Sequence, residues 1–303
     1  MSNLTVSVII SSYNYERFIG QTIESVLAQT RPAYEVIVVD DGSSDNSTDV
    51  IRSFGAALTL IEQKNQGVCK ARNVGAVIAK GEILVFLDSD DLWRPEKLAR
   101  QVDAFEADRE VGLVSCGLRY FDETGKTIIV YDKGKSGWCA KDIVLFREPV
   151  LSTTASAIAV RKDVFEAIGG FDERRELFSA EDLEFCYRAA TVSKVAFIPE
   201  ILVDYRIHGA NGHLNIKRMD RALRFAYEKI FSEASPDIQS VKRESYGNLY
   251  CNLAGSHFRA GNYGWWIANT VKGLCLTPSN IRQFVGYPGR LYHRKRSLNN
   301  GLG

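Results

Sequence analysis

Apolar and polar positions alternate in regular blocks along residues 6–108. Short, continuous apolar runs, which are typical of strands buried on both faces of a parallel sheet, lie at 6–10, 36–39, 58–61 and 83–87. Stretches whose apolar residues recur every three or four positions, as in amphipathic helices, lie at 16–28, 45–54, 68–79 and 95–108. This order predicts an α/β fold in which helices flank a mainly parallel sheet through right-handed crossovers.

After Val111 the pattern loosens into shorter apolar runs between glycine-containing loops, and we assign residues 111–213 to the mixed part of the same domain. Beyond Asn215 the pattern is helical again. Apolar residues recur at helical spacing from 219 to 230, and a second amphipathic stretch covers 241–259. The sequence therefore predicts one domain at 1–213, with halves at about 1–110 and 111–213, followed by a mainly helical region at 214–303.

The composition is that of a soluble globular protein, because 45% of the 303 residues are hydrophobic and 25% are charged. The six cysteines are widely spread and form no Cys-x-x-Cys pair, which argues against a zinc module and a disulfide scaffold. We expect them to be reduced thiols in the core of a cytoplasmic protein. The chain opens with no signal-like segment and contains no apolar run long enough to span a membrane.

The net charge of +1 conceals an asymmetry. Residues 1–213 hold 24 basic and 32 acidic side chains, whereas residues 214–303 hold 14 basic and 5 acidic ones. After Glu244 there is no acidic residue, and aromatic residues are interspersed with the basic ones. This combination suits the surface of an anionic membrane, or a second subunit, or the acidic part of the chain itself. Nucleic acid is disfavoured as a partner, because no binding motif accompanies the charge.

Three polar clusters directly follow predicted strands, at 11–14, 40–43 and 88–91. The carboxyl ends of parallel strands meet at one edge of a sheet, so we expect the three clusters to converge there. Asp88 and Asp90 flank a single residue, and paired carboxylates with substrate phosphates are a usual setting for Mg²⁺ or Mn²⁺. The carboxylates at 40 and 41 can accept hydrogen bonds from a nucleobase or a ribose, although Asp41-Gly42 also reads as an ordinary turn.

Several common sites are excluded by their missing motifs. No Gly-x-Gly-x-x-Gly follows the first strand, and no P-loop motif occurs, so a dinucleotide-binding domain and a P-loop nucleotidase lose their main support. Neither Gly-x-Ser-x-Gly nor His-Glu-x-x-His is present, which argues against a serine hydrolase and a zinc protease.

Taken in order, the remaining motifs closely resemble the family 2 glycosyltransferases, which are inverting enzymes of the GT-A fold. The resemblance is carried by Ser7-Val8-Ile9-Ile10 with Tyr13-Asn14, Val39 to Asp45, Asn65-Gln66-Gly67, Ala71 to Gly75, Phe86 to Asp91, Gly169 to Asp172, Glu181-Asp182 and Tyr205 to His208. It covers the first 210 or so residues. It implies a GT-A catalytic domain at 1–213, with a nucleotide-binding half followed by an acceptor half.

The resemblance also implies which residues bind the nucleotide. The set is Ser11, Tyr13, Asp40, Arg72, Asp88 and Ser89. In such enzymes the residue at the position of Asp40 contacts the nucleobase, Tyr13 walls the same pocket, and Asp88 lies near the ribose. Arg72 is expected near the nucleotide.

The remaining implied roles concern the metal and the proton. Asp90 is the expected ligand of Mn²⁺ or Mg²⁺, His208 is placed like a second ligand, and Asp91 can share the task of either neighbouring carboxylate. Asp182 is the expected general base, with Glu181 as a further candidate. An acid pair at 181–182 also suits the N-terminus of a helix, and the two interpretations are compatible.

These roles describe one displacement at the anomeric carbon, in which a base takes the proton of the acceptor hydroxyl and a nucleoside diphosphate departs. The expected donor is a nucleotide-sugar, UDP-sugar above all. The expected acceptor is a glycan or lipid-linked glycan in surface polysaccharide or glycoconjugate assembly. We expect a cytoplasmic enzyme that reaches the inner face of the membrane through its basic C-terminal region; self-association stays open.

Two alternatives remain from other classes. One is a non-catalytic subunit that binds a nucleotide-sugar. The other is a phosphohydrolase of the haloacid-dehalogenase type, which also places Asp-x-Asp after a strand. Against the second, Leu92 stands where that family has a hydroxyl residue, and the acidic pair follows the fourth predicted strand instead of the first.

Overall fold

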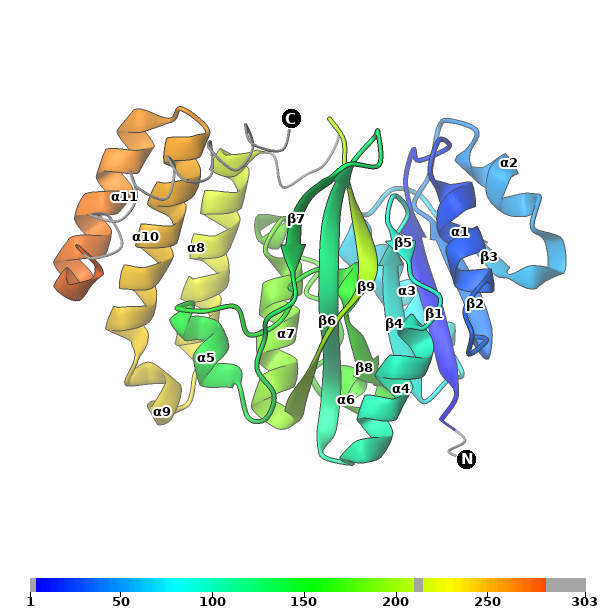
Figure 1. The fold of residues 1–303 in the computed structure, drawn as a ribbon, viewed down its shortest axis with the longest axis horizontal. Coiled ribbons are helices and arrows are strands. Elements are labelled where there is room, and N and C mark those ends of the chain that lie inside the picture. The colour runs from blue at the N-terminus through cyan, green and yellow to red at the C-terminus, as the bar shows by residue number, and fades with distance from the viewer. Residues whose placement is uncertain (1–3, 210–214, 282–303) are drawn as a thin grey trace, which may run out of the picture.

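The computed structural model describes residues 4–209 and 215–281 (Figure 1). Its strands are β1 (Val6–Ser12), β2 (Glu35–Asp40), β3 (Thr59–Glu62), β4 (Ile83–Asp88), β5 (Leu92–Trp93), β6 (Val111–Asp122), β7 (Thr127–Tyr131), β8 (Ala159–Arg161) and β9 (Lys194–Ile207). Its α-helices are α1 (Ile19–Leu27), α2 (Ser47–Arg52), α3 (Val68–Ile78), α4 (Lys97–Ala107), α5 (Ala140–Leu145), α6 (Lys162–Ala167), α7 (Glu181–Val192), α8 (Ile216–Glu233), α9 (Pro236–Gln239), α10 (Lys242–Arg259) and α11 (Tyr263–Leu276).

These strands form one mixed sheet in the order β3-β2-β1-β4-β8-β6-β9-β5, and β7 pairs with β6. Strands β1 to β4 are mutually parallel, as predicted, and β8 is antiparallel to both β4 and β6. The expected mixed, mainly parallel sheet with flanking helices is thereby confirmed. From β1 the sheet continues through β2 on one side and through β4 on the other. Open α/β sheets bind ligands at such a position, where the strand order changes direction.

The core lies on both faces of this sheet, because successive side chains of a strand point to opposite sides. On one face Ile9, Ile37 and Phe86 pack in a cluster that includes side chains from α3, α6, α7 and α8. On the other face Val8, Ile10 and Val38 pack in a second cluster with side chains from α1, α2 and α4. The two layers of helices fix the sheet and leave the carboxyl ends of its strands free for a site.

The region after Val111 contains the two longest strands of the described chain, β6 and β9, although its apolar runs in the sequence are short. β6 and β9 run parallel to each other, but their register shifts near Gly117. A Cβ atom at Gly117 would lie 2.8 Å from the carbonyl oxygen of Glu200 and 2.9 Å from that of Tyr131, so only glycine fits this close approach. Such irregularities, together with Pro199, interrupt the apolar alternation by which long strands are recognised.

The C-terminal helices agree with the predicted helical region. Helix α8 presents Leu223, Tyr227 and Ile230 to the core, and α10 packs beside it, with α11 outermost (Figure 1). The predicted boundary at 213/214 falls in 210–214, outside the described residues, so the division into domains stays a prediction. Trp265 on α11 is 40% exposed and stacks on His257 of α10.

The cysteines follow the expectation of core thiols with one exception. All six are free, and five are buried, but Cys275 on α11 is exposed. In the described part of the chain no helix is both long and apolar enough to cross a membrane.

Candidate functional site

The carboxyl ends of β1, β2 and β4 bring together the three polar clusters found in the sequence. Ser11 pairs in register with Asp88 on β4, and Ser12 pairs with Asp40 on β2. Ser11 and Asp40 are both buried, whereas the Asp88 side chain is 26% exposed. The convergence expected from the strand order is therefore present in the structure.

The Asp40 carboxylate closes the turn that follows β2. Its Oδ1 accepts hydrogen bonds from the backbone nitrogens of Gly42 (3.2 Å) and Ser43 (2.8 Å), and its Oδ2 accepts one from the Ser43 hydroxyl (2.6 Å). A carboxylate offers about four acceptor positions, so about one is left for a further hydrogen-bond donor. Tyr13, at the neighbouring strand end, keeps 45% of its surface exposed.

Asn14 joins the loop after β1 to the loop after β2. Its φ of 59° lies in the left-handed region, which asparagine tolerates better than most residues. In this conformation its backbone nitrogen donates to the Ser43 hydroxyl (2.9 Å), and its Oδ1 accepts from the Ser44 nitrogen (2.7 Å). The two loops that flank the site are thus held as one unit.

Asp41 has a role that the sequence did not reveal. Its Oδ1 accepts hydrogen bonds from the Gln66 nitrogen (2.9 Å) and from Gln63 Nε2 (2.6 Å), and its Oδ2 accepts from the Gly67 nitrogen (2.8 Å). Gly67 precedes α3 and has a φ of 101°, which a residue with a side chain rarely adopts. Asp41 therefore fixes the start of α3, the helix that carries Arg72.

Arg72 is buried and connects two of the predicted site residues. Its Nη2 donates to Asp88 Oδ1 (2.6 Å), and its Nη1 donates to Asp182 Oδ1 (2.8 Å). The guanidinium also lies over the ring of Phe171, 5.1 Å from its centre. Although burial lowers the pKa of Arg72, the carboxylates of Asp88, Asp182 and Glu181 raise it well above the ordinary value, so the side chain is a fixed cation.

Asp182 lies in the first turn of α7, where the helix dipole favours an acidic side chain. Burial raises its pKa to about 7, Arg72 opposes that rise, and Glu181 and Asp88 add to it. Its Oδ2 accepts a hydrogen bond from the Ala155 nitrogen (3.1 Å). A carboxyl group with a pKa near neutrality can accept a proton in one step and release it in the next.

Glu181 is directed differently from Asp182. Its Oε2 accepts a hydrogen bond from the backbone nitrogen of Ser179 (2.6 Å), a residue with a φ of 89°. This contact fixes the turn that leads into α7. Glu181 therefore supports the helix start, in keeping with the expected N-terminal acid pair.

The loop after β4 separates its acidic side chains by environment. Asp91 is fully buried, its Oδ1 accepts from the Arg206 nitrogen (3.0 Å), and burial together with Asp90 and Asp88 raises its pKa well above the ordinary value. Ser89 is buried as well, and its carbonyl oxygen accepts from the Thr22 hydroxyl (3.0 Å). Asp91 and Ser89 thus anchor the loop. The Asp88 side chain is partly exposed, whereas Asp90 is buried.

His208, at the end of β9, lies against Asp90. Its Nε2 is 2.9 Å from Asp90 Oδ2, and its ring packs against Phe18 with a centre-to-centre distance of 5.0 Å. Tyr15, which the sequence did not single out, contacts the same ring edge-on at 5.8 Å. Burial raises the pKa of Tyr15, and so do the nearby carboxylates of Asp90, Asp88 and Asp91, so the phenol stays protonated beside the acids.

Asp90 and His208 offer an oxygen and a nitrogen ligand at one place. No group of three or more histidine, cysteine or acidic side chains able to hold a metal ion occurs among the described residues. A site that supplies one or two ligands still fits Mg²⁺ or Mn²⁺, because these ions complete their coordination with water and substrate phosphates. The donor set therefore suits an ion that arrives with a phosphorylated substrate.

Comparison with known proteins gives one family. The model described as "Glycosyl transferase family 2" matches residues 7–169. An uncharacterized glycosyltransferase of Nostoc sp. is 35% identical over 232 residues, which cover 70% of this chain and 67% of the relative. One from Rickettsia typhi is 32% identical over 68% of this chain and 64% of its own length. The chain thus spans about two thirds of the length of these relatives.

Solved structures share the fold at lower identity. A mannosyltransferase from Pyrobaculum calidifontis, in complex with GDP-Man and Mn²⁺, superposes with a TM-score of 0.68 at 21% identity, over 99% of this chain and 84% of that one. Residues 1–349 of TarS from S. aureus, in complex with UDP-GlcNAc, give 0.63 at 18% identity, over 92% and 83%. At these identities the likeness establishes the fold, which is the predicted GT-A fold with a helical C-terminal region.

Proposed function

Because the chain belongs to glycosyl transferase family 2, and is thus a glycosyltransferase, we propose that it moves a sugar from a nucleotide-sugar to a hydroxyl group with inversion at the anomeric carbon. The observation that carries this proposal is the bridge from Asp88 through Arg72 to Asp182. It places a side chain with a pKa of about 7 at a fixed distance from the strand ends where the nucleotide is expected.

In this mechanism Asp182 is the general base. Its carboxylate accepts the proton of the acceptor hydroxyl as that oxygen bonds to the anomeric carbon, and the bond from this carbon to the diphosphate breaks in the same displacement. The Ala155 nitrogen and the Arg72 guanidinium hold the carboxylate in position. The nucleoside diphosphate leaves with the electron pair of the broken bond, and the attack from the opposite face inverts the configuration.

We propose that Asp90 and His208 hold a divalent cation, Mn²⁺ or Mg²⁺, together with the diphosphate. Their side chains meet at 2.9 Å, and their oxygen and nitrogen donors suit these ions. The bound cation would supply positive charge for the departing diphosphate. The mannosyltransferase of similar fold was solved with Mn²⁺, which supports this assignment.

For the donor we propose UDP-sugar. The nucleotide would lie at the ends of β1, β2 and β4, with Tyr13 and Asp40 toward the base, Ser11 and Ser89 in the surrounding wall, and Asp88 toward the ribose. The two structural neighbours are complexes with GDP-Man and UDP-GlcNAc, which leaves uridine and guanosine as the bases to compare first.

For the acceptor we propose a glycan or lipid-linked glycan of cell-surface polysaccharide or glycoconjugate assembly, met at the inner face of the membrane. Helix α11 contains one charged residue, Lys272, and exposes four large apolar side chains, those of Tyr263, Trp265, Ile267 and Val271. The basic residues at 282–296 follow it in the sequence, outside the described residues, and no acidic residue accompanies them. Apolar and cationic groups in this combination bind anionic lipid surfaces.

Turnover of a donor panel tests the proposal. The purified protein is incubated with UDP-, GDP-, CDP- and dTDP-sugars, with Mn²⁺ or with a chelator, and release of nucleoside diphosphate is measured with and without candidate acceptors. We expect one nucleotide to be released, in the metal-containing samples, and the anomer of the product to be inverted in its NMR spectrum. Retention of configuration, or release of inorganic phosphate from an aryl phosphate in its place, would contradict the proposal.

A further inference from the structure

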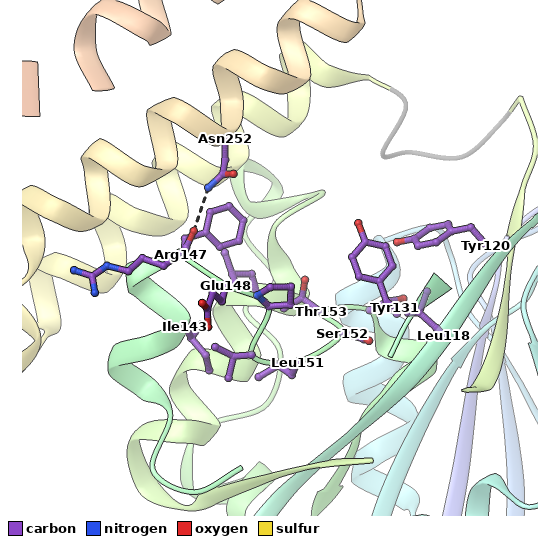
Figure 2. Close-up of a pocket in the computed structure, with 15 residues that line it drawn as sticks. Leu118, Tyr120, Tyr131, Ile143, Arg147, Glu148, Leu151, Ser152, Thr153 and Asn252 are labelled. Carbon is purple, nitrogen blue, oxygen red and sulfur yellow. Dashed lines mark hydrogen bonds between the residues drawn. The ribbon is translucent and has the colours of Figure 1, made fainter. Parts of the chain in front are cut away.

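A cavity of about 360 Å³ lies between the β6–β7 hairpin, the loop at 146–154 and helix α10 (Figure 2). Leu118 on β6 and Tyr131 on β7, which are paired across the hairpin, line one side, and Ile143 and Leu151 line the other. Asn252 of α10 closes the end that faces the C-terminal helices. A cavity of this size and mainly apolar lining is typical of sites for small ligands.

The cavity adjoins the candidate catalytic centre on two sides. One side is formed by Leu183 and Thr154. Leu183 follows Asp182 in the sequence, and Thr154 precedes Ala155, whose nitrogen donates to Asp182. On the other side the ring of Tyr120 packs against Tyr205 at 4.8 Å. A ligand in the cavity would therefore lie beside the candidate base.

The side of the cavity where Tyr120 packs against Tyr205 also faces the acidic loop after β4, where the donor is expected. The next residue, Arg206, donates from its backbone nitrogen to Asp91 Oδ1 (3.0 Å) in the loop after β4. The cavity thus lies between the two parts of the site, the candidate base and the acidic loop, where an acceptor has to meet a donor.

The C-terminal helices hold one wall of the cavity in place. The Tyr227 hydroxyl on α8 donates to the Val144 carbonyl (2.8 Å). On α10, Asn248 Nδ2 donates to the Leu145 carbonyl (2.8 Å). Asn252 Nδ2 donates to the Phe146 carbonyl (3.1 Å), and Figure 2 draws this bond as a dashed line. These three bonds fix the end of α5 and the start of the loop, so the helical region builds part of the site.

The lining of the cavity is apolar and aromatic inside and hydroxylated at its edge. Leu118, Leu151 and Leu183 are buried, and the rings of Tyr120 and Tyr131 meet edge-on at 5.6 Å. Thr153 is exposed at the edge and Tyr131 is 41% exposed. Aromatic faces pack against the C–H faces of sugar rings, and hydroxyl groups bond their oxygens.

The two charged residues of the lining do not place charge inside the cavity. Arg147 forms an ion pair with Glu244, and its side chain points away from the other lining residues (Figure 2). Glu148 is 73% exposed, and its Oε2 lies 3.8 Å from Lys135 Nζ. A charged ligand in the cavity would lose hydration without a charged partner, which is costly.

We propose that this cavity binds the acceptor, and that the acceptor part it holds is a neutral sugar ring bearing an apolar substituent. The ring packs against Tyr131 and Tyr120 with its hydroxyl groups toward Thr153, and the apolar substituent lies against Leu118, Leu151 and Leu183. The orientation of the sugar toward the candidate base rests on the proposed transferase function. The preference of the cavity for neutral ligands rests only on the residues that line it.

Saturation-transfer NMR with defined glycosides tests the proposal on the full chain. The probes are methyl and hexyl glycosides of glucose, galactose, mannose and N-acetylglucosamine, below their micelle concentrations, with the corresponding uronic acids and sugar 1-phosphates as charged analogues. We expect at least one hexyl glycoside to bind, and to bind roughly tenfold or more tightly than its methyl counterpart, because each buried methylene strengthens binding about threefold to fourfold.

Variants locate the binding to the cavity. Thr153→Trp fills the cavity from an exposed position and should weaken hexyl glycoside binding at least tenfold, and Tyr131→Ala should weaken it several-fold. Tyr34→Ala, which removes an exposed tyrosine outside the lining, should change nothing. Calorimetric binding of nucleoside diphosphates to the same variants should match that of the unmodified protein.

Three results would overturn the inference: no glycoside binds, the charged analogues bind more tightly than the neutral ones, or Thr153→Trp leaves binding unchanged. If nucleotides bind normally in any of these cases, the transferase proposal stands and the acceptor assignment fails. If glycosides bind in the cavity but no nucleotide binds, the transferase proposal fails and the neutral-sugar cavity stands.

Discussion

The guanidinium of Arg72 holds Asp182 at 2.8 Å with one nitrogen and Asp88 at 2.6 Å with another. Asp182 belongs to α7 and Asp88 to β4, and the Arg72 side chain between them is only 2% exposed. A single cation therefore sets the position of the candidate base relative to the strand end where the donor is expected.

Replacing Arg72 tests the bridge itself. Arg72→Lys keeps the charge but cannot reach both carboxylates with a planar fork, so we expect a folded protein whose kcat falls on the order of 10²-fold. Arg72→Ala leaves the partly buried carboxylates of Asp88 and Asp182 without their cation and should lower the free energy of unfolding by about 3–5 kcal/mol. Lys70→Ala, on the same helix but 36% exposed, is the control and should change stability by less than about 0.5 kcal/mol. Equal effects at 70 and 72 would argue against the bridge.

Asp182→Asn removes the candidate base while preserving the side chain's shape. We expect kcat to fall roughly 10²- to 10⁴-fold, with nucleotide binding unchanged within a few-fold, because the proton acceptor is lost but the donor site is not. Glu181→Gln is the matched control. Its side chain bonds the Ser179 nitrogen and should cost activity much less. Full activity in the Asp182 variant would remove it from the mechanism.

The pH dependence of kcat/KM reports the same group in the free enzyme. Burial raises the pKa of Asp182 to about 7, so its basic, deprotonated form predominates only above that pH. We expect kcat/KM to rise about tenfold per pH unit below pH 7 and to level off above it. The donor is chosen so that its own charge does not change between pH 5 and pH 8. A flat profile over this range would show that no group with a pKa near 7 limits the reaction.

Asp90→Asn and His208→Asn test the metal assignment separately from the fold. Both side chains supply a ligand atom at one place, so each variant should lose at least tenfold of the Mn²⁺-dependent part of nucleotide binding and keep the metal-independent part. Asp103→Asn, an exposed acid on α4, should behave like the unmodified protein. Titration by calorimetry, with thermal unfolding to verify the fold, provides the measurement. Normal Mn²⁺-dependent binding in Asp90→Asn would contradict the assignment.

Helix α11 offers a test of membrane association. Ile267→Glu and Val271→Glu together place two acids on its exposed apolar face and should reduce sedimentation with anionic vesicles several-fold. Val192→Glu introduces a similar charge at an exposed position on α7 and should have little effect. If the unmodified protein fails to bind anionic vesicles at low salt while it turns over donor, this part of the proposal is wrong.

Strands β1 to β4 could be predicted from local pattern, whereas the two-residue strand β5 was not. Each of these four strands is a short apolar run. The acids at the ends of β2 and β4 mark the strand ends directly, so their convergence follows from the topology of the sheet. β6 and β9 could not be predicted in this way, because the shift near Gly117 and the proline at 199 hide their length. The local signal depends on regular alternation, and these strands lack it.

Contacts between segments that are distant in the sequence could not be predicted either. Arg72 and Asp182 are separated by 110 positions, and their hydrogen bond depends on how α7 docks beside α3, which spacing does not encode. The roles of Asp41 and Tyr15 are similar cases, since one supports Gly67 and the other faces Asp90. The sequence identifies such acidic and aromatic residues as candidates, but only the three-dimensional structure shows which residues they contact.

Calorimetric titration of the protein with UDP, GDP, CDP and dTDP, each with Mn²⁺ and with a chelator, is the first test of the proposed nucleotide-sugar site. We expect one of these nucleotides to bind tightly with Mn²⁺ and much more weakly without it, and Asp90→Asn to abolish the difference. If none of the four binds under either condition, the assignment of a nucleotide-sugar site to Asp40, Asp88 and Asp90 is contradicted.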